Sequence, residues 1–246
     1  MGHGAASTAA DPRGVMGASH PPLEELAGRA RPVALARDRV LPVHPPLEPL
    51  LPDGGLRRGT VVDVPGSTSL ALALLAGASA TGSWCAAVGL SSLGLVAAAE
   101  LGIALDRFPL VAAPPNLDEW AWAVAALLDA VDVVLARPPR PIDAPRARRL
   151  AGRARERSAV LVVTNGAATG RWPEGADLSL SVIRAAWEGV GQGHGYLRAR
   201  RVDVVAEGRG AASRPRRVSL WLPGPGGGVA AASAQTMAPV GSQAVG

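Results

Sequence analysis

The 246-residue chain contains no lysine, so all 25 of its basic residues are arginine. It also has one cysteine, one phenylalanine and one tyrosine, and we therefore expect a core of alanine, valine and leucine. A single cysteine excludes an internal disulfide, and the apolar run around Cys85 favours a buried thiol in a reducing compartment. The missing lysine excludes phosphate-binding loops that depend on an ammonium group, because arginine does not replace it there.

Groups that bind metals or act as nucleophiles are also scarce. The four histidines are scattered and only one cysteine is present, so no metal site is predicted. The sequence has no G-x-S-x-G motif and no histidine placed to activate Ser67 or Ser69, which excludes the familiar forms of nucleophilic catalysis. We expect no cofactor and no enzymatic activity.

Signals for export or membrane insertion are weak. No apolar segment follows a basic N-terminal start, which argues against a secretory signal. Only residues 86–105 approach the length of a membrane span, and serine, glutamate and glycine interrupt them. We predict a soluble cytoplasmic protein that does not contact membranes.

Composition predicts three regions. Residues 1–46 are rich in glycine, alanine, serine and proline and are predicted to form a flexible arm with a short helical segment. Residues 47–228 form the predicted core domain, and the low-complexity residues 229–246 a disordered tail. Five prolines between residues 41 and 52 predict a stiff, extended lead into the core.

Strands and helices are predicted to alternate from residue 59 onward, with Asn116 and Glu119 forming a capping box before the clearest helix. The predicted strands cover residues 60–64, 84–89, 108–112, 131–136 and 159–163, and the helices between them cover 69–79, 93–101 and 146–157. Residues 178–182 then alternate apolar with serine, and a glycine-rich turn at 191–195 leads to predicted strands at 196–206 and 216–222. This order predicts an α/β fold with a mostly parallel sheet flanked by helices and a C-terminal antiparallel extension.

Residues 54–75 are the segment around which the core is organised. A β-branched strand at 60–64 meets a proline–glycine turn, and hydroxyl side chains suited to an N-cap precede a leucine-rich helix. NTPases bind phosphate with this strand–turn–helix geometry, but this turn is too short and lacks the lysine. The residues of this degenerate phosphate loop are Pro65, Gly66, Ser67, Thr68 and Ser69.

The order of these elements resembles the core domain of the bacterial recombinase RecA over Leu47 to Gly228. The glycines before residue 60 match the approach to its phosphate loop, and residues 84–87 resemble its next strand. Residues 130–134 resemble the lead into its Walker B strand, and Thr164-Asn165 occupies the place of its polar sensor.

The catalytic positions depart from RecA. Its phosphate-loop lysine falls in a gap at residues 66–69, its catalytic acid aligns near Ser91, and its Walker B aspartate aligns near Arg137. Phosphoryl transfer depends on a lysine, metal ligands and a group that orients water, so the resemblance implies a RecA fold without ATPase activity.

Because this chain resembles RecA but lacks its Walker motifs, it resembles the ImuA family, which is called ImuA-prime in actinobacteria. That family belongs to a damage-induced mutagenesis cassette. The resemblance implies an adaptor in translesion DNA synthesis, whose partners are the Y-family polymerase homologue ImuB and an error-prone replicative-type polymerase. RecA, a second copy of the chain and single-stranded DNA are further expected partners, and the protein would join the nucleoid during DNA damage. The alternatives are a RecA-fold cell-division inhibitor of the SulA kind, a DNA-binding RecA paralogue, and an ATPase with a deviant loop, which the missing lysine disfavours.

The predicted helix at residues 146–157 holds six arginines against one glutamate. Arg146, Arg149, Arg153 and Arg157 recur along one stripe of that helix. The stripe is either a surface for DNA phosphates or an acidic partner, or a solvated outer face in an arginine-rich protein, and the solvated face is favoured.

The six tryptophans are candidate core and interface anchors. Trp120 and Trp122 lie on different faces of their predicted helix, so one of them is expected in the core. We predict partial exposure for Trp122, Trp172, Trp187 and Trp221, which suits an interface. The proline-rich lead lies where RecA exchanges an N-terminal element with its neighbour, so self-association is a hypothesis.

Overall fold

The computed structural model describes residues 1, 39–165, 170–173, 175–190 and 195–232. The chain divides into two units, Met1–Ala36 and Arg37–Gly246, and the structure described below belongs to the second. Most of the predicted arm at 1–46 and the end of the predicted tail at 229–246 therefore lie outside the described residues.

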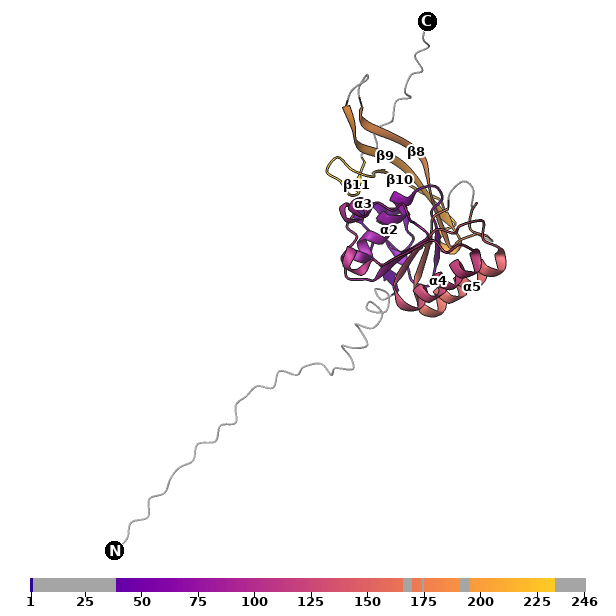
Figure 1. Ribbon diagram of the computed structural model, residues 1–246. Helices are drawn as coiled ribbons and strands as arrows, with labels where there is room; N and C mark the ends of the chain where they lie inside the picture. The colour runs from indigo at the N-terminus through magenta and orange to yellow at the C-terminus, as the bar shows by residue number, and fades with distance from the viewer. Residues whose placement is uncertain (2–38, 166–169, 174, 191–194, 233–246) are drawn as a thin grey trace. The chain divides into compact units, whose positions relative to one another are not determined.

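A nine-stranded sheet forms the centre of the unit, in the order β11-β10-β9-β8-β3-β7-β6-β4-β5. Its strands are β3 (Val61–Asp63), β4 (Cys85–Val88), β5 (Leu110–Val111), β6 (Val133–Ala136), β7 (Val160–Val163), β8 (Leu178–Val190), β9 (Gly195–Gly208), β10 (Arg216–Trp221) and β11 (Ala230–Ala231). The pairs from β8 to β5 are parallel, whereas β8, β9, β10 and β11 pair antiparallel. The predicted α/β fold, with a mostly parallel sheet and a C-terminal antiparallel group, is confirmed (Figure 1).

Helices cover both faces of the parallel part of the sheet. They are α2 (Thr68–Ala80), α3 (Leu95–Glu100), α4 (Leu117–Ala130) and α5 (Ala144–Arg157), with short 3-10 helices η1 (Pro45–Leu50), η2 (Leu105–Arg107) and η3 (Gly210–Ala212). Alternate residues of each strand join different apolar clusters: Val62 and Val162 pack with α2, whereas Val61 and Leu161 pack with α4 and α5. This alternation follows from the period of two along a strand and explains why nearly all residues of these strands are apolar.

The two best-defined helix starts depend on local side chains. The Asn116 Oδ1 accepts a hydrogen bond from the Glu119 backbone N–H at 2.9 Å, which is the N-cap half of the predicted capping box. The Glu119 carboxylate also turns back to Asn116, but it accepts from the side-chain Nδ2 at 2.8 Å rather than from the backbone N–H. Asp143 caps α5 by accepting from the Arg146 N–H at 2.9 Å, so α5 begins at Ala144 rather than at the predicted residue 146. The sequence interpretation placed the start at the first arginine and overlooked the Asp143 cap.

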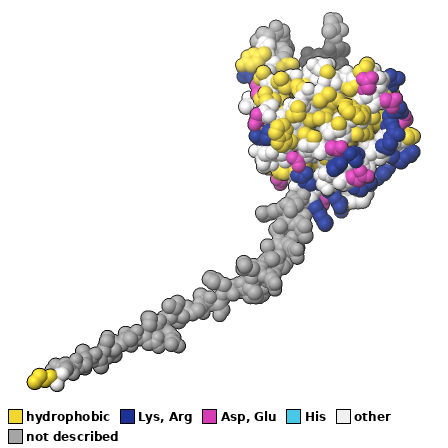
Figure 2. Space-filling model, turned by 60° about the horizontal axis from the view of Figure 1, so that its bottom comes forward, with side chains coloured by type: hydrophobic (Ala, Val, Ile, Leu, Met, Phe, Trp, Pro, Cys, Tyr) yellow, Lys and Arg dark blue, Asp and Glu magenta, His cyan; other side chains and the backbone are white. Residues whose placement is uncertain are grey.

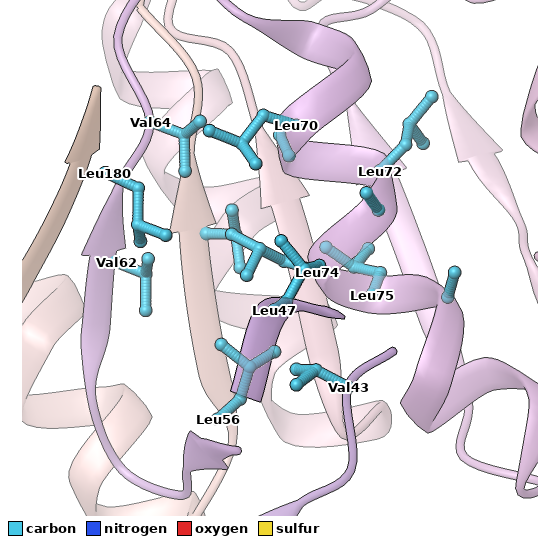
Figure 3. Close-up of a cluster of buried hydrophobic side chains, with 14 of the residues drawn as sticks. Val43, Leu47, Leu56, Val62, Val64, Leu70, Leu72, Leu74, Leu75 and Leu180 are labelled. Atoms are coloured by element: carbon cyan, nitrogen blue, oxygen red, sulfur yellow. The ribbon is translucent and has the colours of Figure 1, made fainter. Parts of the chain in front are cut away.

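The proline-rich lead is not extended, which corrects the prediction. Its prolines begin η1, a 3-10 helix whose Leu47 and Leu50 are fully buried, and β1 (Val40–Leu41) pairs with β2 (Leu56–Arg57) just before and after it. Figure 3 shows Val43 and Leu47 close to the leucines of α2 and to Val62 of β3. The lead is therefore part of the core, and the core begins before residue 47.

The C-terminal hairpin is much longer than predicted. β8 continues to Val190, although residues beyond Ser179 have no partner on β3. β11 lies inside the predicted tail and pairs with β10, so the sheet extends past residue 228. In the part of the chain that the structure describes, no helix is long and apolar enough to cross a membrane.

Candidate functional site

The turn between β3 and α2 has the predicted strand–turn–helix geometry. β3 ends at Asp63 and α2 begins at Thr68, so four residues join them. Gly66 has a φ of +72° and donates its N–H to the Asn165 carbonyl at 2.8 Å, which holds the turn against the end of β7. The Ser67 Oγ accepts from the Leu70 N–H at 3.3 Å and is the N-cap. Four residues leave no room for a loop that wraps a phosphate chain.

An arginine lies at this helix start. Arg137 follows β6, and its Nη2 donates a hydrogen bond to the Thr68 Oγ1 at 2.6 Å. Arg137 lines one hollow with Gly66, Thr164 and Asn165, and a second hollow with Ser69 and Ser92. The Arg137 guanidinium group thus lies at the start of α2, where the helix dipole favours an anion. The same side chain fills part of the space at the carboxyl edge of the sheet.

The position of Arg137 is fixed by the close approach of the chain after β4 to the chain after β6. Gly89 follows β4 with a φ of +80°, and a Cβ at this position would lie 2.2 Å from the Arg137 carbonyl oxygen. The Arg137 N–H also donates to the Val88 carbonyl at 2.9 Å. Ser91, where the RecA catalytic acid aligns, lies exposed in the turn after β4. Among the described residues, no group of three or more histidine, cysteine, aspartate or glutamate side chains comes together to hold a metal.

A buried acid beside the turn was missed by the sequence analysis. Asp63 is 2% exposed and accepts a hydrogen bond from the Asn165 Nδ2 at 2.9 Å. Burial raises the pKa of the Asp63 carboxyl, while hydrogen bonds from the Trp172 backbone and Asn165 and the charge of Arg171 oppose that rise. The one available signal was the aspartate ending an otherwise β-branched strand. The Asp63–Asn165 hydrogen bond joins the end of β3 to the segment after β7, so the role of Asp63 is to hold these two segments together at the carboxyl edge of the sheet.

The arginine stripe of α5 is largely neutralised by acids. Arg146 pairs with Asp118 and Asp143, and the carboxylate of Asp129 on α4 pairs with both Arg153 and Arg157, at 2.6 Å and 3.1 Å. Figure 2 shows basic and acidic side chains next to one another on one face of the molecule. Of the four predicted residues, only Arg149 has no ion pair within the described part of the chain. These ion pairs favour the interpretation of the stripe as a solvated outer face, and a DNA or partner contact by the stripe stays a prediction.

Several tryptophan predictions can be compared with the structure. Trp120 is fully buried, and Trp122 and Trp187 are exposed, as predicted. Trp221 is partly exposed, whereas Trp172 is buried, so its predicted exposure was wrong. Trp172 belongs to the buried apolar cluster that α4 and α5 form with one face of the sheet. The glycine-rich turn predicted at 191–195 lies almost wholly outside the described residues.

Two comparisons with known proteins identify relatives of this chain. A family model described as the MT3502 N-terminal domain matches residues 49–174, just over half of the chain. The chain is also 34% identical, over 146 residues, to a Mycobacterium tuberculosis protein described as uncharacterized protein Rv3395c. That alignment covers 58% of this chain and 71% of the relative. The family match includes the strand–turn–helix, Arg137 and the Asp63–Asn165 pair, and the chain belongs to the family of the MT3502 N-terminal domain.

Proposed function

We propose that the protein is a RecA-like, non-catalytic adaptor of the ImuA kind in a damage-induced translesion synthesis complex. It would bind an ImuB-like Y-family polymerase homologue and an error-prone replicative-type polymerase in the cytoplasm, at the nucleoid after DNA damage. The main observation in support of a protein without ATPase activity is the hydrogen bond from Arg137 to Thr68 at the start of α2.

The sheet supports this proposal through the placement of the motifs. The strands that carry the resemblance are β3, β4, β6 and β7, and all of them are parallel and end at one edge. Parallel α/β proteins bind ligands at that edge. Here the edge presents a four-residue turn, a buried acid held by Asn165 and an arginine, in place of a lysine loop and metal-binding acids. An edge that has the strand–turn–helix arrangement of an NTPase site but lacks its lysine and metal-binding acids suits a protein that positions partners rather than hydrolysing ATP.

The first test is a pull-down from DNA-damaged cells of the source organism, with mass spectrometry of the recovered proteins. Recovery of a Y-family-like protein together with a replicative-type polymerase is the expected result. Recovery of the cell-division GTPase without them would favour the SulA-like alternative and contradict the adaptor role.

A second test addresses the absence of catalysis directly. Purified protein is expected to show no ATP hydrolysis above a no-protein control, with or without Mg²⁺ and DNA, since the RecA resemblance aligns the metal-binding aspartate near Arg137, whose guanidinium group bonds Thr68. Steady hydrolysis that follows the protein through purification would make it an ATPase with a deviant loop.

A further inference from the structure

The outer half of the β8–β9 hairpin exposes large apolar side chains. β8 separates from β3 after Ser179, and β9 pairs with β10 only from Arg201 onward, so both strands run past their neighbours (Figure 1). This outer half carries four of the large exposed apolar residues of the described chain, with exposed fractions between 49% and 67%: Ile183, Trp187, Tyr196 and Leu197. Large apolar side chains that are exposed together on one face of a surface are typical of an interaction site.

Two of these aromatic rings lie on one face with two arginines. Tyr196, Arg198 and Arg200 alternate along β9 and therefore point to the same face, and Trp187 is directly opposite Arg200. The Arg198 Cζ lies 4.8 Å from the Tyr196 ring centroid, and the Arg200 Cζ lies 5.8 Å from the Trp187 ring centroid. These four residues, the aromatic–arginine row, have a ring at each end and two guanidinium groups between.

Charge distinguishes this row from the α5 stripe. Within the described residues neither Arg198 nor Arg200 has an acidic partner, whereas Arg153 is held by Asp129. Glu188 on the same hairpin is opposite Ala199 and so lies on the other face. Residues 178–222 contain eight arginines and three acids, an excess of five that equals the formal net charge of the whole chain. The antiparallel extension is therefore a second basic region besides α5, whose own arginine stripe is largely paired with acids.

We propose that the aromatic–arginine row binds single-stranded nucleic acid, with Trp187 and Tyr196 stacking on bases and the two guanidinium groups contacting phosphates. Aromatic rings on a sheet, interleaved with arginine, are a sequence-tolerant platform for unpaired bases. The four-residue interval between Tyr196 and Arg200 separates the two rings by about 13 Å along the strand, so they would reach different bases. A duplex hides its base faces and would meet the arginines alone. This inference does not depend on the adaptor role.

The test measures binding of fluorescently labelled 20-nucleotide oligo-dT and oligo-U, and of a duplex of equal length, by fluorescence anisotropy. Wild-type protein is expected to bind the single strands more tightly than the duplex, and comparison of the two single strands separates DNA from RNA as the natural source. The double variant W187A/Y196A is expected to bind at least tenfold more weakly, whereas W187F/Y196F, which keeps both rings, stays within about threefold of wild type. The double variant R198Q/R200Q is expected to reduce the salt slope by about 0.7 for each phosphate that it no longer neutralises.

Matched controls separate this site from general effects. W122A removes an exposed tryptophan of α4, and R155Q removes an exposed α5 charge outside the stripe; neither is expected to change affinity. Far-UV circular dichroism and thermal unfolding confirm that each variant folds. Unchanged affinity in W187A/Y196A, equal binding of duplex, or equal weakening in the controls would overturn the proposal. If no single strand binds and W187A/Y196A fails to recover the pull-down partners, the nucleic-acid proposal is wrong and the row is a protein-docking surface. The adaptor role is a separate proposal, and it is contradicted only if the wild-type protein recovers no such partners.

Discussion

Cys85 is a residue whose chemistry is set by its surroundings. It lies fully buried in β4, and burial together with the nearby Asp132 raises the pKa of its thiol to about 12. The thiolate is the reactive form, so the folded protein should hold an inert thiol at neutral pH. We expect iodoacetamide at pH 8 to label native protein far more slowly than protein in denaturant, with mass spectrometry as the readout. Rapid labelling of native protein would show that β4 opens to solvent.

The buried Asp63 predicts a pH effect of known sign. Because its pKa is raised, the folded state keeps the proton to a higher pH than the unfolded chain does. Its contribution to the free energy of unfolding is therefore greatest below 3.8 and falls as the pH rises through the folded pKa. The substitution Asp63→Asn should remove this fall, and the amide of Asn165 can rotate to accept from the new side chain, since its Oδ1 has no partner within the described residues.

Urea unfolding of wild type and Asp63→Asn between pH 3 and pH 8 provides the comparison. We expect the stability of the variant, relative to wild type, to increase as the pH rises. A constant difference between the two proteins would mean that Asp63 has no raised pKa in solution.

Two glycines, one in α2 and one in α5, give opposite predictions at the scale of elements. A Cβ on Gly77 would lie 2.5 Å from the Val43 backbone, whereas a Cβ on Gly152 would meet nothing within 4 Å. We expect Gly77→Ala to destabilise by about 1–3 kcal/mol through overpacking, despite better helix propensity. Gly152→Ala should stabilise by up to about 1 kcal/mol, because alanine is the better helix former. Thermal or urea unfolding measures both, and stabilisation by Gly77→Ala would show that the lead does not pack on α2.

The ion pairs between α4 and α5 predict a salt-sensitive contribution. Asp129 bridges Arg153 and Arg157, and the Arg153 hydrogen bond is the main cause of its lowered pKa. Asp129→Asn should lower stability slightly at low ionic strength, and 1 M salt should abolish the difference because exposed charges are then screened. Asp106→Asn is the control and should have less effect, because among the described residues the Asp106 carboxylate pairs only with the adjacent Arg107. A destabilisation that persists at high salt would indicate packing rather than charge.

Self-association is a prediction about the whole molecule. The lead that carries Val43, Leu47 and Leu50 is buried against α2 and β3 of its own chain. If copies associate through it, they must exchange this segment, which preserves the same contacts. Sedimentation at increasing protein concentration should then show a dimer that exchanges slowly with monomer. A mass that stays monomeric at every concentration would contradict self-association by this route.

Local features were predictable from sequence because they are encoded within a few neighbouring residues. The Asn116–Glu119 capping box, the β-branched strands and the turn at Gly66 followed from side chains three or four positions apart. The alternation of strands and helices was enough to predict a mostly parallel sheet with an antiparallel extension, since few topologies satisfy that order.

Contacts between distant segments were decided only by the tertiary structure. Arg137 meets Thr68 across 69 residues, and Asn165 meets Asp63 across 102, because the parallel register brings the ends of β3, β6 and β7 to one edge. The same register aligns α4 with α5, so that Asp129 neutralises arginines that looked available in the sequence. The sequence alone determined the order of strands and helices in the parallel part of the core and that the turn before α2 is short and lacks a lysine. Which charges stay unpaired depended on packing, because ion pairing is set by distance in space rather than by position along the chain.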